Sequence, residues 1–166
     1  VVLPPAVMLS HDLDNLTGNS FWTQAGRLAR FVKSALRLER SAFRQLGFIA
    51  RNMLSPKRYY FDDQTTMWHQ QQQHGFSSVS YILNGSGGRL GARTPFKLSK
   101  RLVEQAPQEM EVGIHYNYGV LDTPDGLANQ KAQIDSILPK PCTSGRAHYL
   151  KFDAEVDFPK LIEVGV

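Results

Sequence analysis

The sequence predicts an α/β fold in which parallel strands alternate with crossover helices. Short apolar segments that suit strands alternate along the chain with segments whose apolar residues recur every three or four positions. Regular alternation of this kind favours a parallel sheet with right-handed connections. In addition, histidine and aspartate side chains stand at the ends of predicted strands, where parallel folds carry their chemistry.

The composition predicts one globular domain over residues 1–166. Hydrophobic residues make up 42% of the chain and charged residues 20%, which excludes wholesale disorder. No apolar run is long enough for a transmembrane helix. The chain opens without an initiator methionine or the basic start of a signal peptide, so we expect a piece of a longer or processed protein. Cytoplasmic and cell-surface locations both stay open.

The first predicted strand leads into the densest group of polar side chains. Apolar residues 6–9 indicate a buried strand, and Ser10-His11-Asp12-Leu13-Asp14 follows directly. Asp12 and Asp14 stand two positions apart, so in an extended chain they share a face. This suits a pair in which one carboxylate binds a metal and the other transfers a proton. The alternative is a strand that ends in an Asx-turn.

Residues from about 20 to 54 have helical periodicity and belong to a strongly basic segment, Ser20–Arg58, whose net charge of about +8 leaves the rest of the chain mildly acidic. The run is too long for one ordinary helix, so we expect a break near Leu38–Ser41 or at Gly47. The alternatives for the basic face are solvation and contact with nucleic acid, an acidic glycan or a membrane surface. Because exposed aromatics are not interleaved with the basic residues, no nucleic-acid partner is predicted. The basic residues are Arg27, Arg30, Lys33, Arg37, Arg40, Arg44 and Arg51.

The remaining elements complete the alternation. Strands are predicted over residues 77–83, 111–115 and 145–152. A polar helix over 64–74 has Asp62 or Asp63 as its N-cap and ends at Gly75. Helices are also predicted over 98–106, over 123–138 with Thr123 as cap, and over 158–164.

Three histidines stand at predicted strands beside charged partners. His11, His115 and His148 accompany Asp12, Asp14 and Arg146 in the sequence. In a parallel barrel the strand ends converge on one face, so these side chains are expected to meet. One aspartate and two histidines make an open metal site with room for water and substrate. The alternative for each histidine is a hydrogen-bonded role in the core.

Four segments resemble the motifs of the polysaccharide deacetylase (NodB-type) family. Ser10-His11-Asp12-Leu13-Asp14-Asn15 resembles the first motif, in the form H-D-x-D of a bacterial subgroup. Residues 72–83 resemble the helix and second strand of that family. Glu111–Tyr118 resembles the second motif and Gly145–Phe152 the third.

The resemblance implies a distorted or incomplete (β/α) barrel and a metal-dependent hydrolase that removes N-acetyl groups from a sugar or polysaccharide. It implies that Asp12 is the general base and that Arg146 pairs with it and holds it ionised. Asp14 and His115 are implied as metal ligands. Zinc is the expected ion for such ligands, and an N-acetylated carbohydrate is the expected substrate.

The chain departs from the family pattern in two places. Position 119, where the family has a second histidine, is Gly119, and we infer from proximity that His148 replaces that ligand. The sequence stops at Val166, before the later strands that carry the usual catalytic acid. We therefore expect weak turnover or none from this chain, and an open sheet edge that allows a homo-oligomer to form.

Two rival functions follow from the same residues. One is a degenerate module that binds carbohydrate or metal without turnover. The other is an anion-binding protein that works through the basic helices. Bound metal would distinguish the deacetylase and the degenerate module from the anion-binding protein. Turnover would distinguish the deacetylase from the degenerate module.

Overall fold

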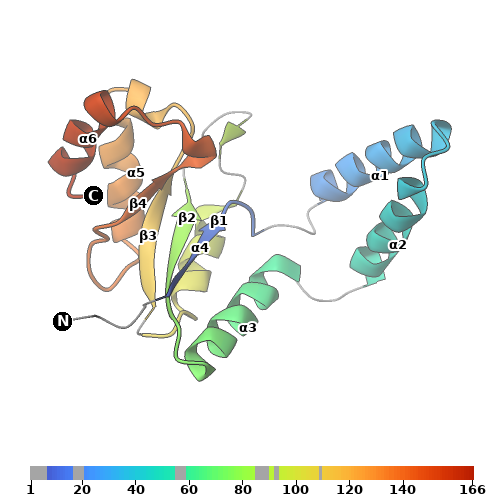
Figure 1. The fold of residues 1–166 in the computed structure, drawn as a ribbon, viewed down its shortest axis with the longest axis horizontal. Helices are drawn as coiled ribbons and strands as arrows, with labels where there is room; N and C mark the ends of the chain where they lie inside the picture. Colours follow the sequence, from blue (N-terminus) through green and yellow to red (C-terminus); the bar gives the residue numbers. More distant parts are fainter. Residues whose placement is uncertain (1–6, 17–20, 55–58, 85–89, 92–93, 109) are drawn as a thin grey trace. The chain divides into compact units, whose positions relative to one another are not determined.

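The computed structural model describes residues 7–16, 21–54, 59–84, 90–91, 94–108 and 110–166 (Figure 1). The chain divides into two compact units, which are described separately. The sheet unit comprises Val1–Asn15 and Thr65–Val166, and the hairpin unit comprises Leu16–Gln64. The single domain over residues 1–166 stays a prediction.

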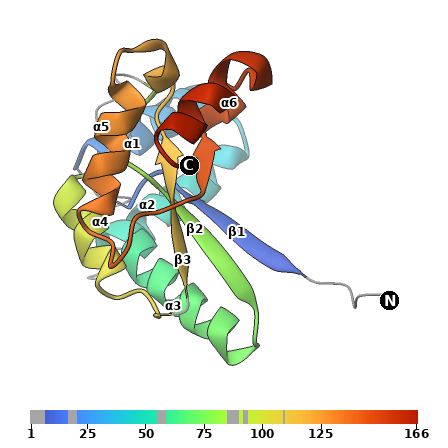
Figure 2. The same cartoon turned by 90° about the vertical axis from the view of Figure 1, so that its left-hand side faces the viewer.

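The sheet unit is built on four parallel strands. They are β1 (Met8–Leu13), β2 (Ser77–Leu83), β3 (Glu111–Tyr116) and β4 (Gly145–Ala147), in the order β1-β2-β3-β4. The sheet curls into a half-barrel with helices between its strands (Figures 1 and 2). This confirms the predicted fold class, an incomplete (β/α) barrel.

The helices of the sheet unit lie between successive strands along the chain. Helix α3 (Tyr59–Gln73) precedes β2, and α4 (Phe96–Val103) joins β2 to β3. Between β3 and β4 come the short 3-10 helix η2 (Val120–Asp122) and α5 (Gly126–Asp135), which packs on β3. After β4 the chain forms η3 (His148–Leu150) and α6 (Ala154–Glu163).

The core of this unit lies around the two central strands. Val79 and Ile82 of β2 and Ile114 of β3 are buried, together with Leu102 of α4 and Ile134 of α5. The apolar residues in 77–83 and 111–115 predicted two strands, and the structure confirms both. Each of these strands has a hydrogen-bonded neighbour on both sides, which accounts for the apolar pattern.

β1 differs from the prediction. Strand pairing begins at Met8 and continues through Ser10, His11 and Asp12, so the polar residues are part of the strand and do not follow it. The predicted strand is confirmed at Met8 and Leu9, but its predicted burial was wrong for the described residues, because Val7 and Met8 are exposed and Leu9 is only half-buried. The reason is its position: β1 is an edge strand that pairs only with β2 among the described residues.

Two helix starts also differ from the prediction. Helix α3 starts at Tyr59, so Asp62 and Asp63 lie inside it and neither is its N-cap; Gly75, with φ 70°, follows its end as predicted. Thr123 does not cap α5, because its hydroxyl donates to the Val120 carbonyl and Asp125 takes the cap position.

The fourth strand is also shorter than predicted. It ends at Ala147, because Tyr149 (φ 59°) and Leu150 (φ 54°) adopt left-handed conformations that leave the extended chain. The last helix begins earlier than predicted, at Ala154. Asp153 caps it by accepting a hydrogen bond from the Glu155 backbone N–H at 3.0 Å.

The hairpin unit contains two complete helices, α1 (Phe21–Leu36) and α2 (Ser41–Leu54), and the first residues of α3 up to Gln64. They contact each other and are joined by a turn in which Leu38 has φ 53°. The break falls at residues 37–40, so the prediction near Leu38–Ser41 is confirmed and the one at Gly47 is not. Ala42 and Ile49 are the buried apolar residues of α2 whose side chains are described.

Trp68 of α3 is the largest buried side chain of the sheet unit. It is 1% exposed, and its indole N–H donates to Ser80 Oγ of β2 at 2.9 Å. We expect Trp68→Phe to lower the free energy of unfolding by about 1–2 kcal/mol, because a buried hydrogen bond is lost and a small cavity forms. Urea unfolding curves measure this. Tyr118→Phe, at an exposed ring, is the control, and an equal effect of both substitutions would contradict the prediction.

Candidate metal centre

Three segments of the half-barrel bring one aspartate and two histidines together. Asp14 follows β1 directly, His115 lies in β3, and His148 follows β4. Asp14 Oδ1 is 3.1 Å from His115 Nε2 and 3.6 Å from His148 Nδ1, and the two ring nitrogens are 3.0 Å apart. One ligand atom from each residue falls within 4.8 Å of the others. We call these three residues the Asp-His-His group.

The tautomer of His115 is fixed by its second ring nitrogen. Its Nδ1 lies 3.0 Å from the Arg146 carbonyl, which can only accept, so the ring donates from Nδ1. The neutral imidazole then has its lone pair on Nε2, the atom that faces Asp14 and His148. Metal-binding histidines are held in this way, with the outer nitrogen donating to a carbonyl.

Burial and charge set the protonation of His148. Burial lowers the pKa of His148, and the neighbouring His115 lowers it as well, while Asp14 and a hydrogen bond to the Leu90 backbone act in the opposite direction. The net change is downward, so the neutral ring is favoured. Metals bind neutral imidazole, and the environment of His148 therefore suits a ligand.

The group is buried on one side and open on the other. The His115 side chain is 3% exposed, whereas that of Asp14 is 53% exposed. Histidines held by the core and a carboxylate at the surface leave space for water and a further ligand, as in metal sites that keep an open position. Within the described residues, the donor set of one carboxylate and two imidazoles fits a first-row divalent ion.

A second group of side chains lies beside the first. Arg146 of β4 extends across the curled sheet, and its two terminal nitrogens reach Asp12 Oδ1 and Ser10 Oγ of β1, each at 2.9 Å. Its guanidinium lies 4.6 Å from the centre of the Tyr81 ring. The structure thus brings together the two residues assigned to catalysis, Asp12 and Arg146, although their roles stay predictions.

His11 does not join either group. Its Nε2 is 2.7 Å from the Gln71 side-chain nitrogen of α3, so it has the hydrogen-bonded role that was the alternative for each histidine. Side chains alternate between the two faces of β1, and this places His11 opposite Ser10 and Asp12.

Two exposed tyrosines beside His148 were not predicted from the sequence. The Tyr149 ring centre is 4.3 Å from that of His148, and Tyr118 packs edge-on against Tyr149 at 6.0 Å. Lys151 lies above Tyr118 and pairs with Asp122. Tyr118 and Tyr149 were visible in the sequence as neighbours of predicted strand ends. Their contact depends on the left-handed backbone of Tyr149, which the sequence did not reveal.

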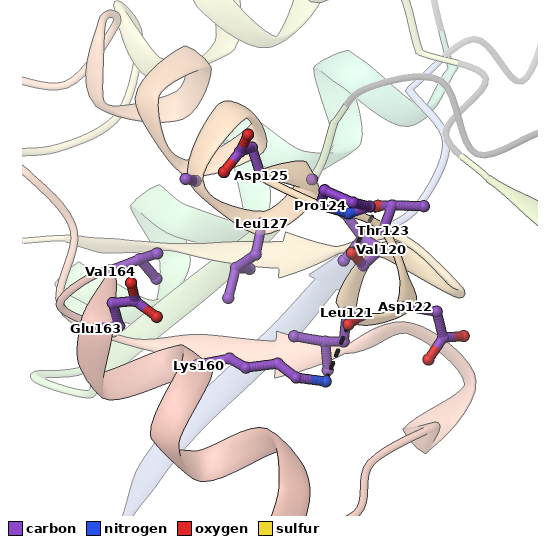
Figure 3. A pocket seen from close by; sticks show the side chains of 12 residues that line it. Val120, Leu121, Asp122, Thr123, Pro124, Asp125, Leu127, Lys160, Glu163 and Val164 are labelled. Carbon is purple, nitrogen blue, oxygen red and sulfur yellow. Dashed lines mark hydrogen bonds between the residues drawn. The ribbon is translucent and has the colours of Figure 1, made fainter.

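A separate pocket of about 360 Å³ lies between the start of α5 and the end of α6 (Figure 3). It is lined by residues 120–128 together with Lys160, Glu163 and Val164, and includes no member of the Asp-His-His group. Lys160 is already engaged there, donating to the Leu121 carbonyl and to Asp157, each at 3.0 Å. The pocket is therefore not the candidate metal centre.

Comparison of the chain with protein-family models, curated proteins and solved structures finds no match. Among the described residues, no helix has both the length and the apolar character needed to cross a membrane. The fold and the Asp-His-His group are therefore the observations on which function can be argued.

Proposed function

We propose that the protein is a metal-dependent hydrolase that removes N-acetyl groups from a sugar or polysaccharide. The observation that carries the proposal is the Asp-His-His group, which could hold a metal ion, with the Asp12–Arg146 pair beside it. These residues lie in the three segments that resemble the polysaccharide deacetylase motifs, and the segments follow one another in the same order as in that family. The reaction acts on a C–N bond that is not a peptide bond.

Asp14, His115 and His148 would hold the ion, and zinc is our choice because this ligand set suits it. When bound, such an ion polarises an amide carbonyl and acidifies water. The hydrogen bond from His115 to the Arg146 carbonyl keeps one ligand correctly oriented before binding.

Asp12 would act as the general base. The Arg146 guanidinium donates a hydrogen bond to Asp12 Oδ1 at 2.9 Å and so fixes the position of the carboxylate that would accept a proton from an attacking water. Both side chains are partly exposed, so water and substrate can reach the carboxylate. Ser10 fixes the other arm of the guanidinium and so limits the positions that Arg146 can take.

Tyr118 and Tyr149 would contribute to substrate binding. Exposed aromatic rings offer flat apolar surfaces together with hydroxyl groups, and this combination suits the mixed apolar and polar faces of a sugar ring. Both rings lie on the side of the site formed by His148 and η3. An N-acetylated carbohydrate is therefore the proposed partner of this face.

A degenerate binding module of the same fold is the second candidate. The observation that favours it is that His148 is occupied within the Asp-His-His group and His11 by Gln71, so neither is free to protonate a leaving amine.

The proposed homo-oligomer would form through β1 or β4, each of which has one neighbour among the described strands.

The test is acetate release from N-acetylglucosamine oligomers by the full chain. With zinc, cobalt or nickel added to metal-free protein, we expect acetate release that EDTA abolishes. We expect it to be slow, because general acid catalysis contributes about 10²–10⁴-fold and no acid is assigned. Metal binding without any metal-dependent release, on oligomers of several lengths, would favour the degenerate module.

A further inference from the structure

The hairpin formed by α1 and α2 is the most strongly charged part of the chain. Residues 21–54 include seven arginines or lysines and one glutamate. That glutamate, Glu39, lies 4.0 Å from Arg37 in the connecting turn. Lys33, Arg40 and Arg44 are exposed to solvent. The hairpin therefore presents a large positive charge that its own residues do not balance.

The same hairpin also exposes an apolar stripe. On α1 the stripe consists of Leu28, Val32 and Leu36, each four residues from the next, and on α2 it includes Phe43 and Leu46. Leu36 and Phe43 are each 82% exposed. Single exposed apolar residues are ordinary, but a row of them along two neighbouring helices marks a surface that binds something.

Both halves of the stripe lie on one side of the hairpin. In each helix the stripe follows the less exposed positions by one residue: Leu36 follows Ala35, and Phe43 follows Ala42. The helices α1 and α2 contact each other and run as a hairpin joined by a short turn (Figure 1). In two antiparallel helices this shared offset turns both stripes toward the same side.

We propose that the α1–α2 hairpin docks on an anionic lipid surface. The apolar stripe would enter the boundary between headgroups and acyl chains, and the flanking arginines and lysines would contact the anionic headgroups. A strongly amphipathic helix with a basic polar face has the properties of an interfacial membrane helix. Juxtaposed basic residues add attraction to the negative surface of a leaflet. This proposal is independent of the deacetylase proposal.

Charge and exposure favour a membrane over other occupants. A second copy of the hairpin would bring two strongly basic units into contact, which like-charge repulsion opposes. A nucleic acid would bind the basic residues through its phosphates and leave Leu36 and Phe43 in water. A lipid surface accommodates the charge and the stripe at the same time.

The test is cosedimentation of the full chain with vesicles. We expect binding to vesicles of phosphatidylcholine with about 30% phosphatidylglycerol, whose anionic headgroups attract basic residues, and little binding to phosphatidylcholine alone. Neutralising three basic residues, with Lys33→Gln, Arg40→Gln and Arg44→Gln, should weaken binding about 100-fold. The matched control neutralises three exposed lysines of the sheet unit, Lys97, Lys100 and Lys140, and should have a much smaller effect.

A second pair of variants tests the apolar stripe. Leu36→Ser with Phe43→Ser should weaken vesicle binding by at least about tenfold. Leu150→Ser with Ile162→Ser, at similarly exposed apolar residues of the sheet unit, should not. Circular dichroism of each variant establishes that the helices persist.

Three outcomes would overturn the proposal. The first is equal binding to neutral and anionic vesicles. The second is equal loss of binding in the hairpin variants and their sheet-unit controls. The third is the absence of vesicle binding. Tight binding to random DNA would then identify a nucleic acid as the partner, and a dimer that dissociates in the Leu36→Ser, Phe43→Ser variant would identify a second copy of the chain.

Discussion

His115→Ala is expected to weaken divalent-metal binding by at least about 100-fold. His115 supplies the central nitrogen of the Asp-His-His group, 3.1 Å from Asp14 and 3.0 Å from His148. Loss of an outer-shell partner alone typically costs 10–100-fold in metal affinity, so loss of a ligand should cost at least as much. Metal-free protein is incubated with zinc, freed of excess ion by gel filtration, and analysed for bound metal.

The control for this substitution is His74→Ala, which also removes one imidazole but at an exposed position after α3. Because burial makes His115→Ala a risk to the fold, Asp14→Asn serves as a second test at an exposed ligand. Zinc at 100 times its dissociation constant should stabilise the wild type and His74→Ala by about 2.7 kcal/mol and neither ligand variant. Equal metal content in all four proteins would exclude the proposed ligands.

Asp12→Asn is expected to reduce metal-dependent acetate release by about 10²–10⁴-fold, or to the metal-free background. Asparagine keeps the shape of aspartate and can still accept a hydrogen bond from Arg146, but it cannot take a proton from water. The bound metal should stay at the wild-type level, since Asp12 is not a member of the Asp-His-His group.

Asp63→Asn, at an exposed carboxylate of α3, is the matched control and should release acetate at the wild-type rate. Two results would reject a base role for Asp12. One is unchanged acetate release in Asp12→Asn, and the other is loss of metal in step with loss of activity. The second result would make Asp12 a metal-site residue.

The strands in the middle of the sheet could be predicted from the sequence, whereas the edges could not. Residues 77–83 and 111–115 are flanked by paired strands, so burial imposes an apolar pattern on them that is visible in one dimension. Among the described strands β1 has one partner, so polar residues are compatible with its pairing. The sequence prediction therefore ended this strand too early. The end of β4 depends on the left-handed backbone of Tyr149 and Leu150. This conformation is rare for tyrosine and leucine, so the sequence does not predict it.

The candidate site shows the same division. Asp14, His115 and His148 could be proposed as a group because parallel strands end at one edge of a sheet. The tautomer of His115 could not be predicted, because it depends on the position of the Arg146 carbonyl in the neighbouring strand. The roles of Asp12 and Arg146, the identity of the ion and the substrate stay predictions from the resemblance.

Arg146 serves the two halves of the site through chemically different parts. Its main-chain carbonyl orients His115, and its side chain reaches Asp12 and Ser10. Any substitution at this position removes the guanidinium but keeps a carbonyl. Natural or engineered variation at position 146 can therefore tune the reactivity of the carboxylate without altering the imidazole that faces the ion. Arg146 thus contacts both His115 and Asp12, but a substitution there changes only the contact with Asp12.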